Sequence, residues 1–189
     1  MIEIEIENKL VKCPQSWDDV KLKTFEELLH FIKTTNLKEG DILYTLKVFS
    51  ILLNLDINIL KCLTRTGFNS LADLLSFTKI EPTPSNTEEW VIEGKKYRLF
   101  KDLNQITMGD SISIETLVKD MDESYITSAI LPFVIRPVLN RTNLDGTVEE
   151  DLGEVDYKRI NKVRDLLSKN LSIRDVLILK DFFLGGERV

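Results

Sequence analysis

The fold is decided by residues 90–114, which read WVIEGKKYRLFKDLNQITMGDSISI. On both sides of Gly94 the residues suit short strands that bury one face. The glycine supplies the positive φ angle that a tight hairpin turn requires. Further along, Asp110 is a residue type that favours the start of a helix. The stretch therefore predicts a β-hairpin that leads directly into a helix.

A similar arrangement is predicted at the N-terminus. Residues 2–6, IEIEI, alternate strictly between apolar and acidic side chains, which indicates a strand with one buried face. The chain is expected to turn at Asn8-Lys9 and to return as a second strand until Pro14, which has no N–H for strand pairing. Thr24 and Glu27 then have the spacing of a capping box, so a helix is expected to begin at Thr24.

The residues that follow the two hairpins share one spacing of apolar side chains, at i, i+3 and i+5. They are Trp17, Val20 and Leu22 in the first case and Leu103, Ile106 and Met108 in the second. One interpretation is an internal structural repeat. The other is that two apolar side chains before a polar cap are a general solution for joining a hairpin to a helix. The sequence leaves both interpretations open.

The stretch between the hairpins is predicted to be helical. A helix from Asp41 to about Asn54 is apolar on nearly all sides, which is typical of a central helix. Asp56 is expected to cap a short helix, Gly67 to end that segment, and Asn69 to start another helix. Short helices with short connections favour a compact helical cluster.

Residues 81–87, EPTPSNT, disfavour regular structure because they contain two prolines and several small polar residues. We expect an N-terminal lobe over 1–80, a linker over 81–88 and a second lobe over 89–189. The predicted fold class is α+β and mostly α-helical, a helical cluster with two short β-hairpins.

The second lobe is expected to continue with helices. One runs from Asp122 to near Ile135 and is kinked or ended by Pro132. Residues 140–153, NRTNLDGTVEEDLG, are predicted to be a long polar connection, and such loops are commonly functional. Two helices are expected to close the chain, over residues 155–169 and 172–184.

Composition excludes some classes of function. The 189 residues carry a formal net charge of -6, which argues against binding along a phosphate backbone. The segment Lys95–Arg98 mixes basic and aromatic residues, but its alternation favours Tyr97 inward with Lys96 and Arg98 outward. We therefore expect no nucleic-acid partner. The longest apolar run is too short and too polar to span a bilayer, so no membrane partner is expected either.

No catalytic, metal or cofactor site is predicted. Cys13, Cys62 and His30 lack the spacing of zinc ligands, and we expect two free thiols, buried or half-buried, and a half-buried histidine. An EF-hand calcium loop around Asp145 would begin at Arg141 and would need a glutamate where Leu152 stands. An Asp-Gly turn is the expected structure there.

Interaction surfaces are predicted instead of a chemical site. An exposed edge strand can be completed by a neighbouring subunit. The polar connection and the apolar end of the chain are two further surfaces of this kind. The candidate interaction residues are Ile2, Ile4, Ile6, Asn143, Asp145, Gly146, Phe182, Phe183 and Leu184.

Three stretches resemble small proteins of tailed bacteriophages, in particular crAss-like phages and others that infect Bacteroides-type hosts. They are WDDVKL (17–22), WVIEGKKYRLFKDLNQITMGDSISIETL (90–117) and DFFL (181–184). The resemblance implies a non-enzymatic structural protein of the virion, in the tail, the neck, a ring or the internal cargo, assembled in the bacterial host cytoplasm. Its partners would be other phage structural proteins or further copies in a homo-oligomer or ring. Alternatives are a tail-assembly chaperone or scaffold absent from the mature virion, and a small enzyme or regulator with an unrecognised site.

Overall fold

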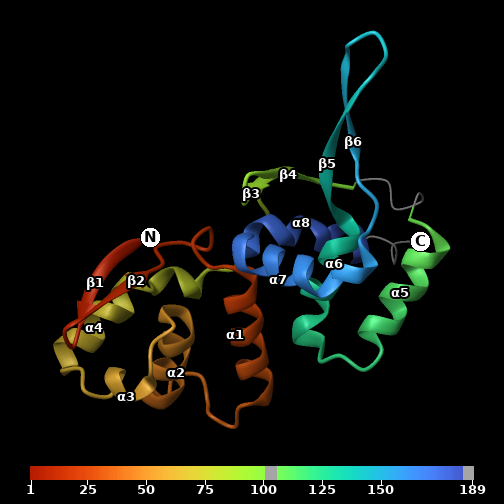
Figure 1. Cartoon of the computed structure of the whole chain (residues 1–189). Coiled ribbons are helices and arrows are strands. Elements are labelled where there is room, and N and C mark those ends of the chain that lie inside the picture. The colour runs from red at the N-terminus through yellow and green to blue at the C-terminus, as the bar shows by residue number, and fades with distance from the viewer. Residues whose placement is uncertain (101–105, 185–189) are drawn as a thin grey trace. The chain divides into compact units, whose positions relative to one another are not determined.

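The computed structural model describes residues 1–100 and 106–184, with side chains as far as Leu179. Its residues form two compact units. Unit 1 contains Met1–Ser85 together with the segment from Ser172 onward, and unit 2 contains Asn86–Leu171. Helices dominate, and the described strands form antiparallel sheets of two and four strands (Figure 1). The predicted class, α+β and mostly α-helical, is confirmed.

Unit 1 begins with a β-hairpin followed by helices. Its elements are β1 (Ile2–Ile6), β2 (Lys9–Cys13), α1 (Leu22–Thr34), α2 (Ile42–Leu53), α3 (Ile57–Leu60), α4 (Arg65–Leu74), the 3-10 helix η1 (Ser76–Lys79) and α8 (Ile173–Leu184). Glu7 and Asn8 join the strands with φ angles of 48° and 62°. Two successive residues of positive φ are typical of a two-residue hairpin turn. The hairpin is therefore confirmed, with its turn one residue earlier than expected.

Helix α1 begins two residues before the predicted capping box. Its N-cap is Lys21, which makes no side-chain cap bond, so the Thr24–Glu27 box is wrong. Leu22 is buried in the core, and Lys21 forms a β-bridge with Ser172. These tertiary contacts fix the chain ahead of Thr24 and override the local signal.

The helical cluster between the hairpins is confirmed, but one boundary in it is wrong. Asp56 caps α3 as expected by accepting a hydrogen bond from Asn58 N at 2.8 Å. Gly67, expected to end a segment, lies inside α4, and Asn69 does not start a helix. Thr64 caps α4 by accepting from Gly67 N at 3.1 Å, so the helix begins at Arg65.

Trp17 holds the start of α1 to the far end of the helical cluster. Its Nε1 donates to Ile80 O at 2.7 Å, and its ring meets Phe25 and Phe77 edge-on, with centroids 5.7 and 5.2 Å apart. Such edge-to-face contacts add to the stabilisation from burial alone. Trp17 therefore fixes the connection between the first hairpin and the helices.

Helix α8 closes unit 1. Ile173 N donates to Val20 O at 2.9 Å, and Ser85 N donates to Arg174 O at 2.9 Å. Ser172 caps the helix as expected, because its Oγ accepts from Asp175 N at 3.2 Å. Residues 81–88 have no helix or strand, and the division between the units follows Ser85. The prediction that α8 belongs to the second lobe is therefore wrong, because these contacts place it in unit 1.

In its described residues, 86–100 and 106–171, unit 2 combines one sheet with three helices and two short 3-10 helices. Its elements are β3 (Glu89–Ile92), β4 (Lys95–Leu99), α5 (Met108–Val118), η3 (Glu123–Tyr125), α6 (Ile126–Val134), β5 (Ile135–Thr142), β6 (Val148–Leu152), η4 (Tyr157–Arg159) and α7 (Ile160–Asn170). The strand order is β3-β4-β5-β6, all antiparallel. The hairpin at Gly94 is confirmed: Glu93 and Gly94 have φ angles of 49° and 74°. Tyr97 is buried, as predicted.

Helix α5 starts at Met108 rather than at Asp110. Thr107 is its N-cap, and Asp110 is the third helical residue, where it completes a capping box with Thr107. Met108 is 76% exposed, whereas Leu22, at the matching position of the proposed repeat, is buried. Leu103 lies outside the described residues. The shared apolar spacing therefore does not produce the same structure after the two hairpins.

The predicted polar connection over 140–153 is wrong. Strands β5 and β6 pair in register from Val138–Leu152 to Thr142–Val148 and form a third hairpin. Opposite charges face each other at Arg141 and Glu149, a favourable cross-strand pair. Helix α6 contains Pro132 and ends at Val134, where the chain continues directly as β5. Helix α7 starts at Ile160, later than predicted.

Candidate functional site

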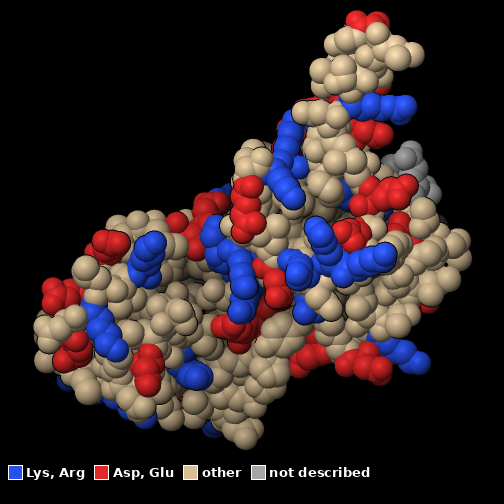
Figure 2. Space-filling model, in the orientation of Figure 1, with Lys and Arg blue, Asp and Glu red and all other residues tan. Residues whose placement is uncertain are grey.

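The hairpin of β5 and β6 projects from the rest of unit 2 (Figure 1). We call residues 138–152 the β-arm. Three apolar side chains lie open to water along it: Leu139 is 54% exposed, Val148 is 60% exposed, and Leu144 is fully exposed. Figure 2 shows mostly uncharged atoms toward the tip of this projection. Apolar groups gathered on an exposed element mark an interaction surface.

The tip of the β-arm holds the predicted residues Asn143, Asp145 and Gly146. Asn143 N donates to Thr147 O at 2.8 Å, and Gly146 has a φ angle of 83°, which favours glycine. Asp145 Oδ1 accepts from Thr147 N at 3.0 Å and from Thr147 Oγ1 at 2.6 Å. These bonds lower the pKa of Asp145 and engage its carboxylate within the turn. The expected Asp-Gly turn is therefore confirmed.

The base of the β-arm is tied to the neighbouring strands by four charged side chains. Lys96 Nζ lies 3.1 Å from Glu89 Oε2 and 3.0 Å from Glu150 Oε1, and Arg98 bonds the same two carboxylates. Hydrogen bonds from Lys96 and then Arg98 hold the pKa values of Glu89 and Glu150 below their usual range. All four groups are solvent-accessible, so salt weakens their interaction. The network aligns β6 with β4 on one face of the sheet.

A buried cluster centred on Asp110 holds β5 to the helices of unit 2. The carboxylate is 3% exposed, lies 3.3 Å from Arg136 Nη2 and accepts a hydrogen bond from Tyr157 OH. Burial alone would raise the pKa of Asp110. The bonds from Tyr157 and Thr107 and the charge of Arg136 hold it below its ordinary value instead. Arg136 also lies over the ring of Phe100, 4.3 Å from its centroid.

The predicted N-terminal surface is only partly exposed. Ile2 is 40% exposed, Ile4 is half-buried, and Ile6 is only 5% exposed, so Ile6 belongs to the core. Among the described residues β1 pairs only with β2, which leaves its outer edge unpaired by any strand. The edge strand is therefore present, but one of its three named residues is unavailable for contact.

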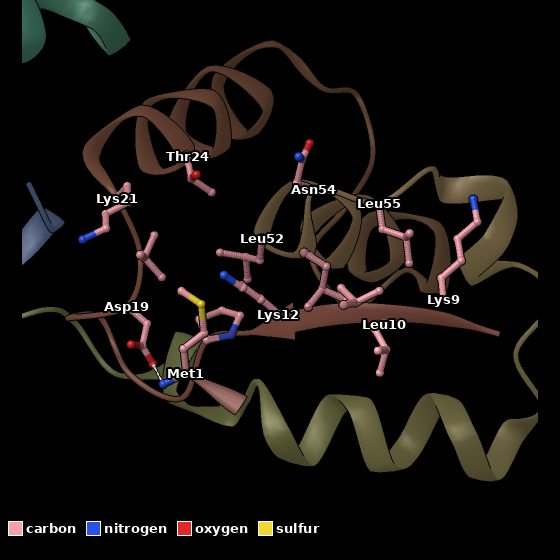
Figure 3. Close-up of a pocket in the computed structure, with 14 residues that line it drawn as sticks. Met1, Lys9, Leu10, Lys12, Asp19, Lys21, Thr24, Leu52, Asn54 and Leu55 are labelled. Carbon is pink, nitrogen blue, oxygen red and sulfur yellow. Dashed lines mark ion pairs between the residues drawn. The ribbon is translucent and has the colours of Figure 1, made fainter. Parts of the chain in front are cut away.

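A groove in unit 1 runs along β2 and has a volume of about 420 Å³. We call it the β2 groove. Figure 3 shows Lys9, Leu10 and Lys12 on its β2 side, with Thr24 of α1 and the end of α2 across from them. The remaining lining residues are Met1, Val11, Pro14, Asp19, Val20, Lys21, Leu52, Leu53, Asn54 and Leu55. No sequence pattern predicts this groove, because its walls come from separate segments of the chain.

The charge of the β2 groove is basic. Three lysines line it, while its one acidic residue, Asp19, is paired with the Met1 ammonium at 2.7 Å. Burial would raise the pKa of Asp19, but hydrogen bonds from Met1 and Gln15 N hold it below its usual value. The floor is apolar, with Val11, Leu52 and Leu53 buried. A basic rim over an apolar floor suits an acidic segment with an apolar side chain.

The other residues named from the sequence are the apolar end of the chain, the two cysteines and the histidine. The side chains of Phe182, Phe183 and Leu184 lie outside the described residues, although their backbone belongs to α8. Cys13 is buried as expected, whereas Cys62 is exposed, contrary to the prediction, and both thiols are free. His30 is half-buried, as predicted.

Among the described side chains, those of residues 1–100 and 106–179, no group of three His, Cys, Asp or Glu is placed to hold a metal ion. No helix in these ranges has the length and apolar character needed to cross a bilayer. Two surfaces stand out in the described chain: the β-arm in unit 2, and the first hairpin with its groove in unit 1. No protein-family model, curated protein or solved structure matches the chain.

Proposed function

We propose that this chain is a non-enzymatic structural protein of a tailed bacteriophage virion, in its tail, neck, a ring or the internal cargo. It acts through contacts with other virion proteins and with its own copies. The observation that carries the proposal is the β-arm, which presents Leu139, Leu144 and Val148 to solvent. The resemblance of three stretches to proteins of tailed phages supports the same role.

The β-arm combines exposure with a firmly held base, as a docking element requires. An isolated two-stranded hairpin is at best marginally stable in water. Here the ion network at Glu150 and the buried pair of Asp110 with Arg136 fix its strands to the rest of unit 2. A partner that covers one of its apolar side chains gains roughly 1.5–3 kcal/mol. Little ordering entropy opposes this gain because the arm is held in place before it binds.

The contacts of two polar residues also support a role without catalysis. The alternative of a small enzyme or regulator would be favoured by a deep polar pocket around Tyr97, Arg98 or Tyr125. Tyr97, on β4, has a buried side chain, and Arg98 forms ion pairs with Glu89 and Glu150. The β2 groove is lined by none of these three residues.

The test is incorporation into particles. We expect the wild-type chain at stoichiometric copy number in purified virions, measured by quantitative mass spectrometry. The variant L139S/L144S/V148T is expected to fall at least about tenfold, because it loses the apolar contacts that bind a partner. Its unfolding free energy is expected to change by less than about 1 kcal/mol, because exposed positions contribute little to stability.

A matched control replaces three exposed apolar residues elsewhere, Ile42, Val91 and Met108, as I42S/V91T/M108S. It is expected to enter particles as the wild type does. Equal incorporation of both variants would contradict the role of the β-arm. A chain that binds virion proteins in lysates but is missing from purified particles would instead be an assembly chaperone or scaffold.

A further inference from the structure

Two strand edges of this chain carry opposite charge. Strand β2 reads KLVKC and borders the basic β2 groove, while β6 reads VEEDL. Among the described residues, β2 pairs only with β1, and β6 only with β5. Each therefore has an outer edge whose backbone groups no described strand pairs. Such an edge is a template for adding a strand from another chain.

The side chains of the two strands complement each other. On β6, Glu150 is held by Lys96 and Arg98, so Glu149 and Asp151 point to the opposite face of the sheet. Both are exposed, and Val148 and Leu152 stand at the ends of the strand. The β2 groove offers the matching features, namely lysines along its rim and the apolar floor of Val11, Leu52 and Leu53.

We propose that β6 of one copy of this chain adds to the outer edge of β2 of a second copy. Lys12 then faces Glu149 and Asp151 on one face of the joined strands. On the other face, an apolar side chain from the ends of β6 enters the β2 groove beside Lys9. The inference rests on the proposed function, because it names the copy-to-copy contact of that structural protein. Main-chain hydrogen bonds supply affinity in such strand addition, and the side chains set its specificity.

The two surfaces differ, so the contact is head-to-tail. Each copy offers one β2 edge and one β6 edge, and both remain usable after the first contact is made. A heterologous contact of this type produces a closed ring or an extending filament, whereas a self-complementary contact stops at a dimer. We therefore expect closed rings, of which a reciprocal dimer is the smallest, or extending filaments, and we expect them to weaken as salt is raised.

Charge reversal tests the pairing. The variants K9E/K12E and E149K/D151K are each compared with the wild type by sedimentation velocity over a range of concentrations. Each variant alone is expected to associate at least about tenfold more weakly, because like charges then face each other. A mixture of the two is expected to regain association to within about threefold, because each reversed edge then meets its complement.

Control variants with the same change of charge are K38E/K61E and E115K/D120K, whose positions are exposed and outside both edges. They are expected to associate as the wild type does. Lys12 faces Glu3 across the hairpin, so K9E/K12E can also weaken the hairpin itself. A second measurement therefore uses the unaltered protein: hydrogen exchange at rising concentration. Amides of residues 9–13 and 148–152 are expected to gain protection as copies associate.

The proposal is overturned if the wild type stays monomeric, if both variants associate as it does, or if protection appears elsewhere. A monomer that is nevertheless stoichiometric in virions would overturn this contact and leave the proposed function standing. An oligomer paired through these edges but missing from virions would overturn the proposed function and leave this contact standing. If the wild type is monomeric and only K9E/K12E is lost from particles, an acidic strand of another virion protein occupies β2, and the copy-to-copy contact is again overturned.

Discussion

At the scale of single residues, Asp110 connects more of unit 2 than any sequence motif indicates. Its carboxylate completes the capping box with Thr107, faces Arg136 on β5 and accepts from Tyr157 on η4. Removing one member of a buried ion pair is strongly destabilising, because the charge that is left stays buried without a partner. Asp110 therefore holds three segments together through one charge.

Asp110→Asn is expected to lower the unfolding free energy of unit 2 by about 2–4 kcal/mol at pH 7, measured by urea denaturation. The pKa of Asp110 is lower in the folded chain than in the unfolded chain. Its contribution is therefore fully present above the unfolded pKa, about 3.9, and is lost as pH falls through the folded pKa. The difference between wild type and variant should stay constant from pH 6 to pH 8 and shrink below about pH 4.

The control for this prediction is Asp120→Asn, because Asp120 is exposed. It is expected to change stability by less than about 0.5 kcal/mol at any of these pH values. A difference between D110N and wild type that is the same at pH 7 and pH 3 would contradict the account of Asp110.

Two glycines should respond in opposite directions to the same substitution. Gly94 has a φ angle of 74°, so Gly94→Ala strains the backbone and is expected to cost about 1–2 kcal/mol. Gly67 lies within α4 at an ordinary φ, and an added Cβ would lie 3.4 Å from Thr64 Oγ1. Gly67→Ala is expected to stabilise the chain by up to about 1 kcal/mol. Thermal unfolding of both variants measures this, and a destabilised G67A would mean that the Cβ is not accommodated.

At the scale of elements, two threonines can be compared. Thr107 caps the start of a helix, whereas Thr24, which the sequence predicts to be a cap, does not. Thr107 caps α5 by accepting from Asp110 N at 3.1 Å, whereas Thr24 lies inside α1, which starts at Leu22. Thr107→Ala is expected to cost about 1 kcal/mol and Thr24→Ala less than about 0.5 kcal/mol, by urea denaturation. Equal losses would contradict the observed start of α1.

Two of the three hairpins could be predicted from sequence, and the reason is local. The IEIEI alternation and the Glu93-Gly94 turn specify strand and turn within a few residues. Strand β5 begins with residues 135–137, which include Pro137 and pair with β4 some 40 residues earlier, and the β-arm that follows carries many charged residues. Its tip residues were predicted as an interaction surface, but Leu139, Leu144 and Val148 were not. Their exposure follows from the projection of the arm, which no local pattern encodes.

At the scale of the whole molecule, unit 1 is discontinuous in sequence and unit 2 is inserted within it. The linker could be predicted from its two prolines. The return of α8 to unit 1 could not be predicted, because it depends on the backbone hydrogen bonds from Ile173 to Val20 and from Ser85 to Arg174. Hydrogen bonds between distant segments leave no periodicity in the sequence of either segment.

The residues that flank the insertion, Ser85 and Ser172, both lie against the carboxylate of Asp175. Ser85 Oγ donates to Asp175 Oδ1 at 3.0 Å, and Ser172 N donates to Asp175 Oδ2 at 2.9 Å. A linker of about four glycine and serine residues therefore spans the gap between Ser85 and Ser172. A chain that joins residues 1–85 to residues 172–189 in this way is expected to unfold cooperatively, as followed by circular dichroism in urea.

Residues 1–85 alone are the comparison, because they keep every element of unit 1 except α8. Removing α8 takes Ile173, Val176 and Leu179 out of the core, where each is at most 3% exposed. Burial of three such side chains contributes roughly 5–9 kcal/mol, which is comparable to the whole stability of a small domain. The fragment should therefore be largely unfolded where the joined chain is folded. Equal stability of the two would show that α8 is not part of the core of unit 1.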